Sequence, residues 1–393
     1  MSIDFHQEAL ALKPELIERR RDFHRHPELA FEEVRTAEIV ARALAGLGME
    51  VQTGVGKTGV VGLLEGGQDG PTVLVRADMD ALPIHEANET NYVSQTPGKM
   101  HACGHDGHTS MGLAVARLLS DRREAMQGRV KFVFQPAEEI GEGASEMIKD
   151  GVLENPRPDV SVGLHLWNNL PVGQVAVMAG PSMAAADIWT CTIKGHGGHG
   201  AAPHQTHDPI VAASQIVLAL QTITSRNVNP LDTAVVSVGM IHGGDAFNVI
   251  PSVVQMEGTI RTFSVSTQEM VHNRLRALCA GMAISLQCEA DVTIRTMTPA
   301  VYNDPDVTAR VRQAAARVVG EDNVRDDQRT MGSEDMARLM DDVPGCYFFV
   351  GSANVEKELD FPHHNPRFDI DEEALPIGVA ILAGAVASYV LPE

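Results

Sequence analysis

The sequence predicts an α/β protein in which a mostly parallel sheet is interrupted by an inserted ferredoxin-like α+β domain. Between residues 60 and 165, short β-branched apolar runs alternate with amphipathic segments. This pattern is typical of parallel strands joined by crossover helices. From about residue 183 to residue 298 the order changes to strand, helix, strand, strand, helix, strand. That order is the one found in ferredoxin-like domains.

Composition narrows the class of protein. The 393 residues are enough for roughly two to three domains. The formal net charge of −21 provides no positive field to attract phosphate groups, which argues against nucleic acids and membranes as partners. No apolar run reaches the ~18 residues that cross a bilayer, no signal peptide is visible, and the five cysteines are not spaced as a disulfide framework. We therefore expect a soluble, cytoplasmic protein.

The parts of the chain outside residues 183–298 carry the predicted parallel sheet. An amphipathic helix is expected over residues 8–22, with Pro14 as an early breaker or a first-turn residue, and a second helix ends near Gly46. Strands are expected at five apolar, β-branched runs, namely 60–64, 72–76, 129–134, 159–164 and 346–350. The other helices are expected to end near 119 and to cover 143–149, 306–319 and 371–390, with a short one starting near 332.

The inserted segment combines half-exposed strands with two long helices. Strands are expected at 187–194, 233–240, 252–262 and 288–296, and helices at 208–225 and 267–286. Asp208 is the predicted N-cap of the first of these helices, with Pro209 at its first position. Glycine–proline and threonine–proline pairs at 180–181 and 298–299 are candidate linkers. The predicted domains are therefore residues 1–182 with 299–393, and residues 183–298.

Residues 101–108 form a dense group of metal-binding side chains. Three histidines, one cysteine and one aspartate fall within these eight residues, namely His101, Cys103, His105, Asp106 and His108. A thiolate, imidazoles and a carboxylate are the ligands that zinc and neighbouring transition metals prefer. The alternative is a polar turn that happens to be rich in histidine. The choice depends on whether the rest of the chain supplies further ligands.

Acidic residues and a histidine follow the predicted parallel strands. Asp78 and Asp80 come after the second strand, Glu138 and Glu139 after the third, and His165 after the fourth. Each has an ordinary interpretation on its own, as a helix cap, a solvated acid or a hydrogen-bonded histidine. Because the carboxyl ends of parallel strands meet at one edge of a sheet, the coincidence favours a common site. There one glutamate can bind a metal while its neighbour acts on a water molecule.

Six sequence segments together resemble the M20 metallopeptidase family. The resemblance is to its amidohydrolase branch of hippurate hydrolases, N-acyl-amino-acid deacylases (aminoacylases) and auxin-conjugate hydrolases. The segments are collinear with that family and extend over nearly the whole chain, at 76–83, 100–106, 135–139, 163–165, 195–204 and 364–366. The resemblance implies a zinc-exopeptidase-like catalytic domain with an inserted lid and dimerisation domain. It also implies two divalent metal ions per subunit (Mn, Zn, Co or Ni), a homodimer or homotetramer formed through the lid, and hydrolysis of an N-acyl amino acid to a carboxylic acid and an amino acid.

The resemblance also implies roles for individual residues. The implied metal ligands are Cys103, His105, Glu139, His165 and His364. His363 is the rival of His364 for the last position. Glu138 is the implied general base. Asp78 and Asp80 are expected behind the ligands, where Asp80 orients a neighbouring group.

The other implied site residues lie in the inserted domain. His199 is expected to stabilise the oxyanion, and in dimeric relatives that histidine can come from the partner subunit; the alternative is an incidental histidine in a glycine-rich loop. Arg261 and Asn248 are expected to bind the substrate carboxylate, although Arg261 suits a solvated strand face equally well. Two other functions stay open: a dipeptidase or aminopeptidase of the same superfamily, and a non-catalytic metal-binding protein. The presence of Glu138 argues against the latter.

Overall fold

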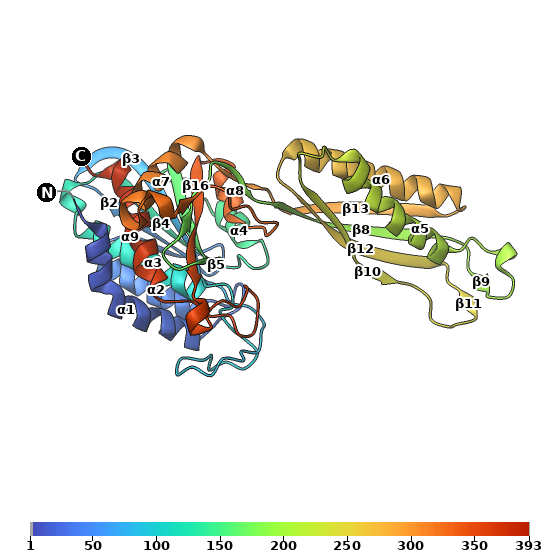
Figure 1. Ribbon diagram of the computed structural model, residues 1–393, viewed down its shortest axis with the longest axis horizontal. Coiled ribbons are helices and arrows are strands. Elements are labelled where there is room, and N and C mark those ends of the chain that lie inside the picture. Colours follow the sequence, from blue (N-terminus) through green and yellow to red (C-terminus); the bar gives the residue numbers. More distant parts are fainter. Residues whose placement is uncertain (1–2, 393) are drawn as a thin grey trace. The chain divides into compact units, whose positions relative to one another are not determined.

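The structure is a computed structural model that describes residues 3–392 (Figure 1). The chain divides into two compact units. The first unit contains the chain up to Ser182, together with Tyr302–Arg329 and the residues from Asp335 onward. The second unit contains Met183–Val301 and Thr330–Glu334. The second unit therefore continues past residue 298 and includes a short segment near residue 330 that no sequence pattern indicated.

The first unit is built on an eight-stranded sheet with the order β1-β2-β4-β3-β5-β16-β6-β15. β4, β3, β5 and β16 are parallel neighbours at its centre, whereas β1 and β2 join antiparallel at one side. The predicted mostly parallel sheet is thus confirmed. The strands are β1 (Glu50–Val55), β2 (Gly59–Glu65), β3 (Gln68–Asp78), β4 (Gln127–Gln135), β5 (Val160–Pro171), β6 (Val175–Ala176), β15 (Val324–Arg325) and β16 (Gly345–Ala353).

The central strands are buried on both faces, which explains their continuous apolar sequences. Val75 of β3 pairs with Phe132 of β4 on one side and with Val162 of β5 on the other, and all three side chains are buried. Every residue of β16 is buried as well. By contrast, β1 is mostly exposed and polar, so its sequence carries no strand pattern, and the prediction missed it.

Helices cover this sheet (Figure 1). α9 is almost entirely apolar and packs against α1, α3, α7 and the central strands, which accounts for its composition. No helix among residues 3–392 is both long and apolar enough to cross a membrane. The helices of this unit are α1 (Phe5–Arg25), α2 (Val34–Gly46), α3 (His105–Ser120), α4 (Gly143–Lys149), α7 (Pro305–Val319), α8 (Met336–Met340) and α9 (Ala374–Val390).

Pro14 does not act as a breaker or a first-turn residue, so that prediction is wrong. It lies inside α1, which begins at Phe5 and is capped by the Asp4 side chain accepting from the backbone N–H groups of His6 and Gln7. A proline inside a helix removes one hydrogen bond and crowds the preceding turn. Here α1 packs along α9 and α3, and tertiary packing of this kind outweighs the local preference.

The second unit has a four-stranded antiparallel sheet with the order β10-β12-β8-β13 and two helices, α5 and α6. Two helices packed on one face of such a sheet confirm the predicted ferredoxin-like arrangement. Asp208 caps α5 with Pro209 at its first position, as predicted. The elements are β8 (Ala185–Lys194), β9 (Gly198–His199), α5 (Pro209–Thr222), β10 (Ala234–His242), β11 (Val249–Ile250), β12 (Val253–Thr262), α6 (Val265–Ser285) and β13 (Glu289–Thr298).

Candidate metal centre

The parallel strands of the first unit place the predicted acidic residues at one edge of the sheet. Asp78 ends β3 and pairs in register with Gln135, which ends β4 and precedes Glu138. The prediction that His165 follows its strand is wrong, because β5 runs on from Val160 to Pro171. The register explains why His165 still belongs to the group. Arg76 of β3 pairs with Gly163 of β5, so two residues further along each strand Asp78 and His165 lie level.

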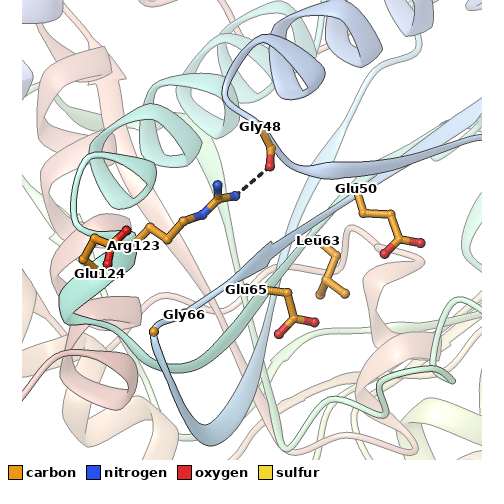
Figure 2. Close-up of a pocket in the computed structure, with 8 residues that line it drawn as sticks. Gly48, Glu50, Leu63, Glu65, Gly66, Arg123 and Glu124 are labelled. Carbon is orange, nitrogen blue, oxygen red and sulfur yellow. Dashed lines mark hydrogen bonds between the residues drawn. The ribbon is translucent and has the colours of Figure 1, made fainter.

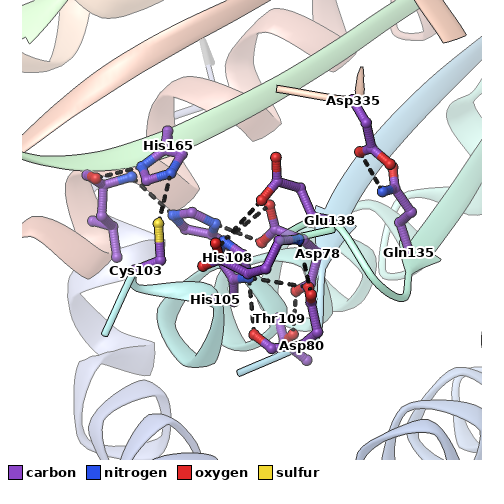
Figure 3. Close-up of polar contacts among 12 residues, drawn as sticks. Asp78, Asp80, Cys103, His105, His108, Thr109, Gln135, Glu138, His165 and Asp335 are labelled. Carbon is purple, nitrogen blue, oxygen red and sulfur yellow. Dashed lines mark hydrogen bonds and ion pairs between the residues drawn. The ribbon is translucent and has the colours of Figure 1, made fainter. Parts of the chain in front are cut away.

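Six side chains from distant parts of the sequence meet at this edge. His165 Nε2 lies 3.5 Å from Cys103 Sγ. His105 Nε2 lies 3.9 Å from Glu138 Oε2 and also 3.9 Å from Glu139 Oε1. On the other side of Glu139, its Oε2 lies 3.3 Å from His364 Nε2. We call this group the donor cluster; it consists of Cys103, His105, Glu138, Glu139, His165 and His364. Figure 3 shows four of its members, Cys103, His105, Glu138 and His165.

The donor cluster fits divalent metal ions. Its thiolate, imidazole and carboxylate atoms form several groups of three that lie within 4.8 Å of one another. His105 Nε2 and Glu139 Oε1 are buried and accept or donate no hydrogen bond among the residues described. A buried polar atom without a partner costs free energy, and coordination to a cation removes that cost. Mixed nitrogen, sulfur and oxygen donors suit zinc and its neighbours.

Asp80 lies directly behind two members of the donor cluster. His105 Nδ1 is 2.9 Å from the backbone oxygen of Asp80 and 3.3 Å from its Oδ1. The other carboxylate oxygen, Oδ2, accepts a hydrogen bond of 3.0 Å from the backbone N–H of Glu139. In the neutral form of His105 the proton therefore lies on Nδ1, which leaves the Nε2 lone pair facing the glutamates. Such partners behind a metal ligand fix its orientation and tautomer.

The peptide groups around Leu166 set the tautomers of three histidines. The N–H of Leu166 donates to His108 Nε2 over 2.9 Å, so His108 donates from Nδ1 to Asp78 Oδ1, 2.6 Å away. The carbonyl oxygen of Leu166 accepts from His165 Nδ1 at 2.5 Å and from His363 Nε2 at 3.0 Å. His165 consequently keeps its Nε2 lone pair directed at Cys103.

Electrostatics differ between the two buried histidines of the cluster. Burial alone would lower the pKa of His105, but the carboxylates of Asp78 and Asp80 outweigh burial and raise it to about 10. The same negative surroundings favour a bound cation at the Nε2 atom of His105. Burial, together with neighbouring His108 and His363, holds the pKa of His165 well below its usual range. His165 is therefore neutral, which is the form that binds metals.

His363 and His364 occupy different positions. His364 has a backbone φ of 65° and donates its N–H to the Ala102 carbonyl oxygen, which places its ring beside Glu139. The ring of His363 instead stacks on Trp167, with ring centroids 4.7 Å apart, and its Nε2 is engaged by Leu166. The arrangement favours His364 as the ligand.

A buried ionic network supports the start of α3. Sequence reasoning expected Asp106 to brace this helix but missed its partners Arg20 and His24. Arg20 is fully buried and donates to Asp106 Oδ2 and Asp369 Oδ1 over 2.8 and 2.7 Å. His24, one helical turn later in α1, lies 2.7 Å from the same Asp106 oxygen. Asp106 thus braces α3 rather than facing the donor cluster. The four-residue spacing of Arg20 and His24 was the available signal, since it places both on one helix face.

Three predicted site residues belong to the second unit. His199 lies on β9, which pairs with β11 next to Asn248. Its Nδ1 accepts from the Ala201 N–H over 3.0 Å, so the exposed ring in its neutral form carries the proton on Nε2 and presents a donor. β12 begins at Val253, four residues after Val249, the partner of His199. Arg261 lies near the opposite end of β12, about 26 Å from Val253 at roughly 3.3 Å per residue. The unit therefore brings His199 and Asn248 together but keeps Arg261 apart from them.

A separate pocket in the first unit shares no residue with the donor cluster (Figure 2). Arg123 crosses it and donates to the carbonyl oxygen of Gly48 over 2.7 Å. The pocket is lined by Gly48, Glu50, Leu63, Glu65, Gly66, Gly67, Arg123 and Glu124. Surface glutamates alone do not indicate a ligand, whereas the donor cluster combines side chains of several metal-binding types.

Known proteins are similar to this chain in both sequence and fold. A model of peptidase family M20/M25/M40 matches residues 74–388. The N-acetylcysteine deacetylase of Bacillus subtilis is 40% identical over 368 residues, which cover 93% of this chain and 94% of that protein. IAA-amino acid hydrolase ILR1-like 4 of Arabidopsis thaliana is 40% identical over 376 residues, 95% and 85% of the two chains. Among solved structures, the YXEP protein of Bacillus subtilis, a dinuclear metal-binding peptidase of the M20 family, matches with a TM-score of 0.85 and 35% identity over 96% of this chain and 98% of that one.

The fold and the donor cluster define a metal-binding hydrolase with an α/β catalytic architecture. The chain belongs to the peptidase family M20/M25/M40, as the family match and the relatives show. Within that family it falls in the amidohydrolase branch, so the resemblance noted from the sequence motifs is confirmed.

Proposed function

We propose that this protein hydrolyses the amide bond of N-acyl amino acids in a metal-dependent reaction that releases a carboxylic acid and a free amino acid. The observation that carries the proposal is the position of Glu138 within a set of metal-binding side chains, with its Oε2 3.9 Å from His105 Nε2. Relatives named for an N-acetylated amino acid and for an IAA-amino acid support this substrate class.

The residues of the donor cluster have distinct roles in this proposal. The metal ligands are Cys103, His105, Glu139, His165 and His364. Two divalent ions (Mn, Zn, Co or Ni) bound there would polarise the substrate carbonyl and make a water molecule more acidic. Glu138 accepts the proton of the attacking water and later delivers it to the leaving amine. Asp80 keeps His105 and Glu139 directed into the cluster.

The second unit is proposed to act as a lid and dimerisation domain. His199 donates a hydrogen bond from Nε2 to the developing oxyanion, and Arg261 and Asn248 bind the substrate carboxylate. Arg261 lies near the end of β12, whereas His199 pairs with Val249, which precedes the start of β12, so the two residues are farther apart than an N-acyl amino acid is long. Both can serve one substrate only if two copies share a site, which supports a homodimer or a homotetramer.

The cellular location belongs to the same proposal. All five cysteines are buried and none forms a disulfide bond within residues 3–392, which suits the reducing cytoplasm.

A substrate panel tests the proposed function. Metal-reconstituted protein is incubated with hippurate, N-acetyl amino acids and free dipeptides, and the released amino acid is quantified. Hydrolysis of the acylated compounds, lost on chelation and restored by a divalent metal, is the expected result. Exclusive cleavage of dipeptides with a free amine, or activity that survives complete metal removal, contradicts the proposal.

A further inference from the structure

The turn that carries Glu138 contains a residue in an unfavourable conformation. Ala137 has a φ of 53°, in the left-handed region that residues with a Cβ atom seldom adopt. Its carbonyl oxygen accepts from the N–H groups of Glu142 and Gly143, and the Glu138 carbonyl accepts from Gly141. These hydrogen bonds engage the carbonyl oxygens of Ala137 and Glu138. The N–H of Ala137 is engaged by a different part of the chain.

Glu33 provides that partner from a distant part of the chain. Its Oε1 accepts hydrogen bonds from the N–H of Ala137 at 2.9 Å and from the N–H of Phe31 at 3.0 Å. Its Oε2 accepts from the hydroxyl of Thr58 at 2.5 Å. Phe31 also has a positive φ, of 63°. One carboxylate therefore stabilises two left-handed residues, one before α2 and one in the turn after β4.

The Glu33 side chain has no solvent exposure. A buried carboxylate is costly unless donors surround it, and here three donors do. Burial raises the pKa of this carboxyl, although the hydrogen bond from Thr58 acts in the opposite direction. Three hydrogen bonds fix the position of both carboxylate oxygens, and we expect this position to hold the turn.

Two carboxylates bracket the proposed general base. Glu33 holds the N–H of Ala137, the residue before Glu138, and Asp80 holds the N–H of Glu139, the residue after it. Glu138 thus sits between two fixed peptide groups. We propose that Glu33 is a positioning residue that sets the direction of the Glu138 side chain by fixing the left-handed turn at Ala137. This inference rests on the proposed function of Glu138.

Two conservative substitutions separate geometry from charge. Glu33→Gln keeps one oxygen that can accept hydrogen bonds from the N–H groups of Phe31 and Ala137. Its NH₂ group then faces the Thr58 hydroxyl, whose oxygen can accept a hydrogen bond. Glu33→Asp keeps the charge but is one methylene too short to reach Ala137. Glu32→Gln is the matched control, because Glu32 is the neighbouring residue and its side chain is 61% exposed.

The four proteins are compared for kcat, KM, metal content, thermal unfolding and hydrogen exchange of the 135–143 segment. We expect Glu33→Asp to lose about 10- to 100-fold in kcat, the cost of a misdirected catalytic group, with KM and metal content unchanged. Exchange of the Ala137 amide should quicken in this variant only. Glu33→Gln should stay within about threefold of the parent kcat, as should Glu32→Gln.

Several results would overturn the assignment. An active Glu33→Asp, an inactive Glu33→Gln, or a loss of kcat that follows loss of metal or of folded protein each excludes a positioning role. If the parent hydrolyses no N-acyl amino acid, the proposed function has failed. The exchange rate of the Ala137 amide still decides in that case whether Glu33 holds the turn.

Discussion

Asp80→Asn should weaken metal binding without altering any ligand. The carboxylate of Asp80 accepts from His105 Nδ1 on one oxygen and from the Glu139 N–H on the other. Asparagine has a single side-chain oxygen, so one of these donors then faces an NH₂ group. His105 keeps its 2.9 Å hydrogen bond to the backbone oxygen of residue 80, which limits the damage.

Two independent estimates give the same magnitude for this loss. One hydrogen bond to a charged group contributes about 1.5–3 kcal/mol. Substitutions directly behind metal ligands cost about 10- to 100-fold in affinity or activity, equivalent to about 1.4–2.8 kcal/mol. We therefore expect the dissociation constant for zinc or manganese to rise about 10- to 100-fold in Asp80→Asn.

The assay is a titration of metal-free protein in competition with a chromophoric chelator, with circular dichroism to verify folding. Asp69→Asn is the control, because Asp69 has a fully exposed side chain. If folded Asp80→Asn binds metal as tightly as the parent and the control, Asp80 does not orient the ligands and the reasoning is refuted.

Three further predictions address the cluster and its support. Cys103→Ser should lower metal affinity in the same titration, because a neutral hydroxyl replaces a thiolate; unchanged affinity would remove Cys103 from the ligand set. Glu138→Gln should retain full metal content but lose about 10²- to 10⁴-fold in kcat, and an active variant would exclude Glu138 as the base. Hydrogen bonds with Asp106 and Glu86 raise the pKa of His24 to about 9, even though burial and Arg20 lower it. The pKa of His24 in the folded state thus lies above its ordinary value of 6.5. The stabilisation is therefore complete below about pH 6.5 and is lost as the pH rises through about 9. In denaturant unfolding, the free energy of unfolding of the parent should fall by about 3 kcal/mol over that interval relative to His24→Gln. Parallel plots of this free energy against pH for the two proteins would contradict the prediction.

Local sequence patterns were sufficient to predict the elements whose residue types match their surroundings in the fold. The buried parallel strands are continuous apolar runs, and Asp208 with Pro209 specifies the start of α5 without help from the rest of the chain. Pro14 shows the limit, because packing of α1 against α9 decides the outcome there and no local pattern reports it. His165 shows a second limit. A polar residue inside a strand resembles the end of that strand when only the sequence is known, because the neighbouring strands that extend it are not visible there.

The acidic pairs explain why part of the site escaped prediction. Glu32–Glu33 and Glu138–Glu139 look the same in the sequence, as two adjacent charges on a loop. In the structure Glu32 is exposed, whereas Glu33 is completely buried against Ala137. Burial of an acid depends on donors that arrive from elsewhere in the chain, and composition cannot reveal them.

The peptide groups at Leu166 have a consequence for mutational tolerance. They determine where three histidines carry their protons, yet they belong to the main chain, which every substitution except proline leaves in place. Position 166 can therefore vary in sequence among apolar residues without disturbing the protonation pattern of the site. Proline is the exception, because it removes the N–H that His108 accepts, and replacement of that amide by an ester tests the same atom chemically.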